Sequence, residues 1–330
     1  MKHLILVGAC YVDTILTQDK PFAIPRFPEE DAKLRATSLR VRRGGNCPNT
    51  IEVLQQLLRN LPGGGDGSSP QEEVLQMHLV SPLPERQSQA TANIIASLTP
   101  TSTSPGREPS PSSEATGSRT IVNHNDLPEM TAAEFLVVAE AFWGRGEKTW
   151  WHFEGRIPET TLECVRSLRR VLGASATVSV EVEKPGRPGL RELAAEADVV
   201  FYSKSWAEHC GYTSAEACLR GESQPRASLA MITWGAEGAS CLSLQDQRYV
   251  ERPVEHAVQH VADSVGAGDT FVAGMLYGLI CRERWELGEK LGFAVDLATL
   301  KVQREGFSGL GDDMQSRASG GSSVSDQARQ

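Results

Sequence analysis

Short apolar runs alternate with helical patterns along most of this chain, and that alternation is the strongest constraint on its fold. Six runs rich in apolar and β-branched residues are predicted to be buried strands, at 3–8, 77–81, 149–153, 176–182, 199–203 and 229–233. Residues with helical spacing lie between them, at 46–58, 158–172 and 190–197. The pattern favours a mainly parallel α/β sheet covered by helices on both faces, with ligands bound beyond the carboxyl ends of the strands.

Composition permits an enzyme and argues against several other classes. A chain of 330 residues, 40% hydrophobic and 23% charged, can bury one large core or two smaller ones. Its net charge of -9 argues against nucleic-acid binding, and no apolar run approaches the roughly 20 residues that span a membrane. The seven cysteines are scattered, odd in number and never in a C-x-x-C pattern, which predicts reduced thiols in a cytoplasmic protein.

Three segments are too polar to pack. Residues 61–72 are rich in Gly, and residues 99–116 are rich in Pro, Ser and Thr, so both are predicted to be flexible. The polar tail 312–330 is predicted to be disordered. A single domain over residues 1–311 is therefore expected.

A turn of small residues carrying two carboxylates precedes an apolar helical pattern at 262–271. Successive backbone N–H groups in such a turn converge on an anion, and the following helix adds the positive end of its dipole. Asp269 would be unfavourable beside a phosphate unless it accepts a proton from a hydroxyl that attacks that phosphate. The simpler interpretation is a Gly-rich strand-to-helix turn whose Asp caps the helix, because short Gly motifs often match by chance.

A second group of polar residues lies near the N-terminus. Asp13 follows the first strand, and the segment 42–49, Arg-Arg-Gly-Gly-Asn-Cys-Pro-Asn, places two amides at the start of a helix. A carboxylate accepts from vicinal hydroxyls while an amide donates and accepts, a combination suited to sugars. The alternatives are an Asx turn for Asp13, an N-cap for Asn46 and solvated strand positions for Arg42 and Arg43.

Together these motifs resemble the PfkB-type carbohydrate kinases, the family of ribokinase and adenosine kinase. Residues 263–271 and 42–49 are similar to the family's two signatures. Longer blocks resemble its ketohexokinase-like branch, at 117–121, 152–156 and 178–185, with further support at 201–204 and 233–239. The resemblance covers most of the chain. It implies a ribokinase-like three-layer fold with a small β lid, formed by residues of about 10–43 and 117–125.

The resemblance also implies a role for each matching residue. Asp269 would be the general base, and the N–H groups of the turn would form the anion hole, at Gly266, Ala267 and Gly268. The sugar would be held by Asp13, Gly45, Asn46, Asn49, Arg119 and Glu154. ATP would be contacted by Lys184, Ser203, Lys204, Trp234, Gly235, Gly238 and Asp263. Glu181 would act on Mg²⁺ through its water shell. Surface ion pairs remain the alternative for Arg119 and Lys184, and a core position for Trp234.

The chain departs from the family pattern at three places. Residues 203–206 replace an N-x-x-E motif, which ketohexokinase-like sequences also lack. Residues 98–117 contain prolines where relatives have lid and sheet-edge strands, and an insertion at 18–26 alters the first lid loop. Part of the lid is therefore expected to be missing, which would weaken both the activity and a homodimer formed through the lid.

The main hypothesis is an ATP-dependent kinase of a small, ketohexose-like sugar. A ribokinase-type or nucleoside substrate is the alternative among kinases. A catalytically impaired sugar- or nucleotide-binding protein is the alternative from another class. An NAD-binding domain is disfavoured, because no G-x-G-x-x-G follows the first strand.

Overall fold

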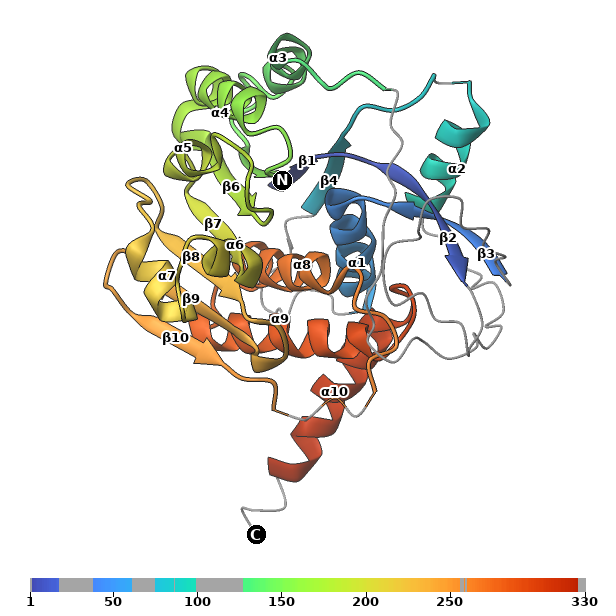
Figure 1. Ribbon diagram of the computed structural model, residues 1–330, viewed down its shortest axis with the longest axis vertical. Coiled ribbons are helices and arrows are strands. Elements are labelled where there is room, and N and C mark those ends of the chain that lie inside the picture. The colour runs from blue at the N-terminus through green and yellow to red at the C-terminus, as the bar shows by residue number, and fades with distance from the viewer. Residues whose placement is uncertain are drawn as a thin grey trace, which may run out of the picture.

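A central sheet of eight strands organises the protein in the computed structural model, which describes residues 2–17, 38–60, 75–85, 87–98, 127–255, 258 and 260–325 (Figure 1). The strand order is β10-β9-β8-β7-β6-β5-β1-β4. The strands from β4 to β8 in this order are parallel: β4 (Leu75–Val80), β1 (Lys2–Val7), β5 (Lys148–Phe153), β6 (Ala176–Val182), β7 (Val199–Ser203) and β8 (Leu229–Thr233). All six predicted strands are confirmed.

Helices cover both faces of the sheet because successive strand residues point to opposite sides. Leu4 and Leu6 pack against one group of helices, and Ile5 and Val7 against the other. The first group is α1 (Asn46–Asn60), α8 (Ala267–Ile280), α9 (Leu287–Val302) and α10 (Leu310–Ser325). The second is α3 (Ala132–Glu140), α4 (Pro158–Leu172), α5 (Leu190–Ala195), α6 (Lys204–His209) and α7 (Ala215–Gly221). The expected three layers are present, with α2 (Gln89–Leu98) beside α1.

Several elements differ from the sequence prediction, which did not include α2, α3, α6, α7 and α9. β9 (Ala239–Ser243) and β10 (Tyr249–Arg252) extend the sheet as an antiparallel pair that was not predicted, because short strands with serines and edge charges lack a clear apolar run. The chain was also expected to leave the fold near Leu310, but α10 continues to Ser325. Leu310 and Met314 are buried against the α1 layer, so the first turns of this helix belong to the core.

A small separate sheet lies where the lid was expected. β2 (Tyr11–Thr17) pairs antiparallel with β3 (Ser38–Gly44), and Asp13 stands opposite Arg42. The predicted lid strand at 117–125, the altered segments 18–26 and 98–117 and the flexible segment 61–72 lie wholly or almost wholly outside the described residues. None of the described helices is both long enough and apolar enough to cross a membrane.

The helix α8 packs so closely on α9 that one of its positions has no room for a side chain. A Cβ at Gly274 would lie 2.7 Å from Cα and 2.9 Å from Cβ of Ala294. The two helices lie side by side in Figure 1, and α8 is buried along nearly its whole length. Because Gly274 has no side chain, α8 can pack against α9 at this short distance.

We predict that Gly274→Ala lowers the free energy of unfolding by about 1–3 kcal/mol, because the added methyl group overpacks the contact between α8 and α9. Urea denaturation measures this change. Gly292→Ala in α9 is the matched control, because its Cβ would have only ordinary contacts, the nearest being 3.6 Å from Arg252 Nε. The control should be neutral or more stable by about 0.5–1 kcal/mol. Equal effects of the two substitutions would contradict this account of the packing.

Candidate active site

The turn before α8 requires glycine at one position for two reasons. Gly266 has a φ of +82°, a conformation that residues with side chains rarely adopt. A Cβ there would also lie 2.4 Å from the Phe307 ring. The Gly266 carbonyl accepts hydrogen bonds from Thr270 N (2.9 Å) and Thr270 Oγ1 (2.7 Å), which fix the first turn of the helix.

Asp269 lies in this first turn and is held by α1. Its carboxylate accepts a hydrogen bond of 2.7 Å from Asn49 Nδ2, and its carbonyl accepts one of 3.2 Å from Thr50 Oγ1. The side chain does not cap the helix, since the cap residue Gly266 has no side-chain bond. Burial, followed by the charge of Glu181, raises the pKa of Asp269 well above its usual value, and the Asn49 bond opposes this rise. Within the protein alone, the surroundings of Asp269 therefore favour its protonated form.

The N–H groups of the turn differ in their availability. Ala267 N donates to Ser264 O at 3.3 Å, so this member of the expected anion hole is already used. Gly266 N and Gly268 N have no hydrogen-bond partner in the described part of the chain. Gly268 is exposed, and a Cβ there would meet nothing within 4 Å. The open space at Gly268 lies at the helix N-terminus, where an anion is favoured.

Asp263 holds the turn before α8 in place through its hydrogen bonds and ion pairs. Its buried carboxylate lies 3.1 Å from Lys301 Nζ and 3.3 Å from Arg42 Nη1, and it accepts from Val265 N at 3.0 Å. Lys301 Nζ also donates to the Asp263 carbonyl at 2.9 Å. These bonds tie the turn to α9 and β3. A nucleotide contact for Asp263 stays a prediction.

Two buried glutamates stand at the carboxyl ends of β5 and β6, where ligands were expected. Glu154 Oε2 accepts from Ala9 N at 3.0 Å, and burial, followed by the charge of Glu181, raises the Glu154 pKa to about 7. Burial and the charge of Glu183 raise the Glu181 pKa to about 8. The charge of Glu181 raises the pKa values of both Glu154 and Asp269, and the two glutamates hold protons near neutral pH.

The Asn46 side chain does not cap α1. The helix begins at Asn46 itself, and its Nδ2 donates to Glu181 Oε2 (2.7 Å) and Glu183 Oε2 (3.0 Å). The other amide, Asn49, accepts from Arg43 Nη1 at 3.1 Å, and Arg43 also bonds to Glu52. Arg43 is therefore a buried partner of the site and not a solvated strand residue.

A buried histidine that was not predicted as a site residue positions Glu181. Trp150 Nε1 donates to Ser179 Oγ (2.8 Å), which lies 2.9 Å from His152 Nδ1. His152 Nε2 lies 2.9 Å from Glu181 Oε1. Burial lowers the His152 pKa to about 3, so the ring is neutral and donates through only one nitrogen. A polar residue between Trp151 and Phe153 in a buried strand was the sequence signal that could have revealed it.

The remaining predicted sugar residues lie around the same edge. A Cβ on Gly44 would be 2.2 Å from Asp13 Oδ2, so the Asp13 side chain lies against that glycine. Gly45 has a φ of +107°, and a Cβ there would be 2.2 Å from Ala9 O. Asp13, Gly45, Asn46, Asn49 and Glu154 thus belong to one connected region, whereas Arg119 lies outside the described residues.

The predicted nucleotide residues form a second group beside the glutamates. Ser203 Oγ donates to the Glu183 carbonyl at 2.6 Å. Lys204 Nζ lies 5.3 Å from the centre of the Trp234 ring and 3.3 Å from Glu237 Oε1. These contacts bring the segment after β7 together with the segment after β8, which contains the 3-10 turn Gly235–Glu237 and Gly238. Lys184 is exposed after β6.

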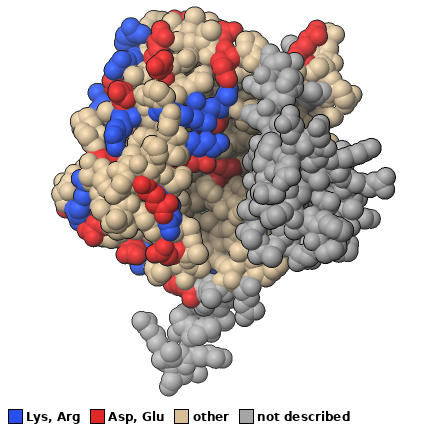
Figure 2. Space-filling model, viewed as in Figure 1, with Lys and Arg blue, Asp and Glu red and all other residues tan. Residues whose placement is uncertain are grey.

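The site can serve a magnesium ion that keeps much of its water. Among the described residues, no three His, Cys, Asp or Glu side chains converge as a direct metal-binding group. Mg²⁺ commonly binds through one or two carboxylates, substrate phosphates and several waters, so the clustered glutamates fit that mode. Figure 2 shows acidic side chains at the upper end of a hollow in this face of the protein, with basic side chains above them.

Known proteins resemble this chain in sequence and in fold. Residues 108–311 match the pfkB family carbohydrate kinase description. Over 326 residues the chain is 30% identical to ketohexokinase of Mus musculus, covering 94% of this chain and 99% of that protein. Ribokinase from Giardia lamblia has a TM-score of 0.69 at 16% identity, covering 96% of this chain and 100% of that one. Ribokinase of Arabidopsis thaliana, complexed with ribose and ATP, has a TM-score of 0.56 at 17% identity, covering 92% and 93%.

We predict that the glutamate cluster makes stability fall as pH rises. The Glu154 pKa is about 7 in the folded protein against 4.5 ordinarily, so its stabilising contribution is complete below about pH 4.5 and is lost as pH rises through 7. Glu154→Gln keeps an acceptor for Ala9 N and should reduce this fall by on the order of 3 kcal/mol, at about 1.4 kcal/mol per pKa unit. Urea titrations between about pH 4.5 and pH 8 measure it. Parallel curves for variant and parent would show that Glu154 is not protonated by folding.

Proposed function

This chain belongs to the pfkB family of carbohydrate kinases, and we propose that it transfers the γ-phosphoryl group of ATP to a primary hydroxyl of a ketohexose-like sugar. Family membership makes it an ATP-dependent sugar kinase. The assignment of roles to particular residues, the substrate and the use of Mg²⁺ are our proposal. A cytoplasmic location likewise stays a prediction.

The proposal rests on the position of Asp269. Its carboxylate is bound to the side-chain amide of Asn49, and it lies next to the available N–H of Gly268. Asn49 Nδ2 donates to its carboxylate at 2.7 Å, and Gly268, one residue earlier, has a free N–H at the N-terminus of α8. A hydroxyl held by the amides would therefore lie between the base and the phosphate that it attacks.

In the proposed reaction, Asp269 removes the proton from the sugar hydroxyl as its oxygen attacks the γ-phosphorus. The new O–P bond forms while the bond to the bridging oxygen breaks, and the electron pair leaves with ADP. The N–H groups of Gly266 and Gly268 stabilise the charge on the transferring group, with the α8 dipole behind them. When bound, Mg²⁺ would neutralise phosphate charge, and Glu181 is the candidate to hold its water shell.

The raised pKa of Asp269 is compatible with its role as a general base. A general base works best when its pKa lies near the working pH, and burial beside Glu181 moves Asp269 in that direction. Positive charge brought close to these carboxylates with ATP would favour the ionised form, so substrate binding would itself prepare the base.

The substrate class is supported by the mouse relative, whose name is ketohexokinase. Likeness in fold alone favours no particular sugar, and a ribose or nucleoside substrate remains the alternative. An ADP-release screen with ketohexoses, aldoses, polyols and nucleosides separates them. The highest kcat/KM should be found with a ketohexose. No release with any acceptor would favour the catalytically impaired alternative, whose basis at 18–26 and 98–117 lies almost entirely outside the described residues.

We predict that Asp269→Asn lowers kcat for ADP release by about 10²- to 10⁴-fold, because the amide cannot accept the hydroxyl proton. The variant should still bind ATP, which calorimetry measures. Asp246→Asn, on the exposed turn between β9 and β10 beside the amino end of β8, is the control and should keep the parental rate. Parental activity in Asp269→Asn would refute the assignment of the base.

We also predict that Gly268→Ala lowers kcat/KM by about 10²-fold, because the methyl group would occupy the space in which the phosphoryl group must approach the N–H. Its Cβ meets no protein atom within 4 Å, so the free energy of unfolding should stay near the parental value. Gly266→Ala provides the contrast, because its methyl group collides with Phe307 and should also destabilise the fold. Full activity in Gly268→Ala would contradict an anion hole at this position.

A further inference from the structure

A cavity lined by charged side chains lies at the opposite edge of the sheet from the active site. Four arginines and one glutamate line this space of about 450 Å³: Arg166, Arg169, Arg170, Arg226 and Glu196. We call it the arginine pocket. Its arginines from α4 lie in the half of that helix that leads into β6, Glu196 follows α5, and Arg226 precedes β8. The pocket is therefore at the amino ends of parallel strands, whereas the active site is at their carboxyl ends.

Acidic partners within the protein account for only part of this positive charge. Arg166 Nε lies 3.2 Å from Glu196 Oε1, and Arg169 Nη2 lies 2.9 Å from Asp198 Oδ1. Arg170 donates to Ser167 Oγ at 2.7 Å and has no carboxylate partner among the described residues. Arg226 has no hydrogen bond or ion pair in that part of the chain. Two guanidinium groups beside one cavity thus lack a counter-charge, in a chain whose net charge is -9.

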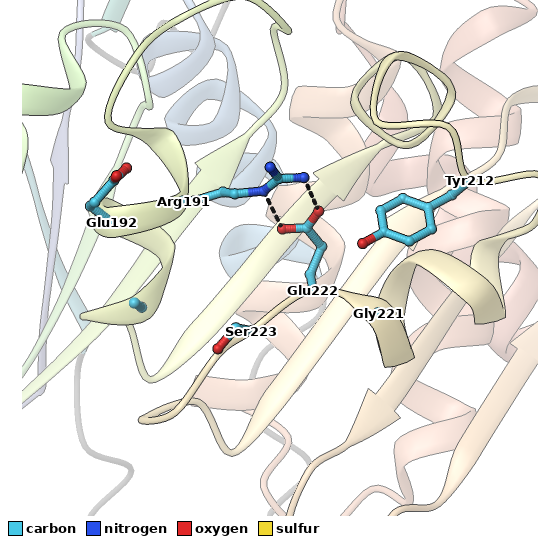
Figure 3. A pocket seen from close by; sticks show the side chains of 7 residues that line it. Arg191, Glu192, Tyr212, Gly221, Glu222 and Ser223 are labelled. Atoms are coloured by element: carbon cyan, nitrogen blue, oxygen red, sulfur yellow. Dashed lines mark hydrogen bonds and ion pairs between the residues drawn. The ribbon is translucent and has the colours of Figure 1, made fainter.

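A neighbouring cavity shows how this protein neutralises an arginine elsewhere. In the pocket of Figure 3, about 350 Å³ in volume, Arg191 points at Glu222 and donates to both of its oxygens, at 3.2 and 3.0 Å. Tyr212 lies on the far side of the same carboxylate. That cavity has no unpaired guanidinium, so it presents no comparable site for an anion.

The dipole of α4 explains why two of the arginines are favourable at their positions, but it does not explain the position of Arg226. Arg169 and Arg170 are in the last turn of α4, where cations are favoured by the negative end of the helix. Arg226 is not in a helix, since α7 ends at Gly221. Arg226 is exposed and lines the cavity with neither a helix end nor a carboxylate partner beside it in the described part of the chain.

We infer that the arginine pocket binds a small phosphorylated anion. The planar fork of a guanidinium matches a phosphate group and donates two parallel hydrogen bonds to it. The cavity volume lies within the range of small-molecule sites, about 300–1,000 Å³, which favours a phosphorylated metabolite over an acidic protein segment. Arg170 and Arg226 are the primary contacts, and Arg166 adds positive charge; all three side chains are exposed and so accessible to an anion from solvent.

Isothermal titration with pyrophosphate tests the site, with the active site filled by a non-hydrolysable ATP analogue. The parent should show saturable binding. Arg170→Gln/Arg226→Gln should weaken it by about tenfold or more, because hydrogen bonds to charged groups are lost. The matched control is Arg220→Gln/Arg248→Gln, which removes the same charge at exposed ion pairs and should bind as the parent does.

The inference is overturned if the parent does not bind pyrophosphate, if the folded double variant binds it as tightly as the parent, or if the control is weakened equally, which would indicate a non-specific surface affinity only. Circular dichroism checks that the double variant folds. If it does not, Arg170→Gln and Arg226→Gln are titrated singly, and parental affinity in both would also overturn the inference. Binding does not depend on phosphoryl transfer, so the result stands apart from the proposed catalytic roles.

Discussion

The close packing of α8 against α9 is the constraint on which the active site depends. Gly274 lets the Ala294 backbone approach to a distance that a side chain would prevent, and α8 is consequently buried in the layer beside the sheet. Its N-terminus is thereby carried to the carboxyl ends of the strands. Asn49 and Thr50 of α1 then bond to Asp269 from the side. The base is thus fixed by two helices that pack on the same face, and not by the turn alone.

This placement concentrates negative charge in a poorly solvated space. Asp269, Glu154 and Glu181 are all buried, and burial is the main cause that raises their three pKa values. The charge of Glu181 adds to the rise for Glu154 and Asp269. The hydrogen bonds of Asn49 and Asn46 oppose this effect without cancelling it. A cation that arrives with the substrate would favour the ionised form of these carboxylates. Substrate binding would therefore promote ionisation of the base. His152, neutral and buried, fixes the orientation of Glu181 within this cluster.

The sequence was sufficient to predict those elements of the fold whose residues have a strong local pattern. The buried parallel strands are continuous apolar runs, and all six were predictable for that reason. The motif residues also come together, because parallel strands end at one edge. Side-chain partners were harder to predict: Asn46 looked like a helix cap but donates across to Glu181 and Glu183, a pairing separated by more than a hundred residues. α10 was missed because its few apolar residues, Leu310 and Met314, are surrounded by polar ones.

The central claim is that Asp269 accepts the proton and that burial, together with its glutamate neighbours, raises its pKa. The most direct measurement is the pH dependence of single-turnover phosphoryl transfer in the parent and in Glu181→Gln. The account predicts a rate that rises with pH through a pKa well above 3.8, with this rise displaced to lower pH in the variant because a neighbouring negative charge is removed. A rise at the same pH in both proteins, or a displacement to higher pH, would contradict it.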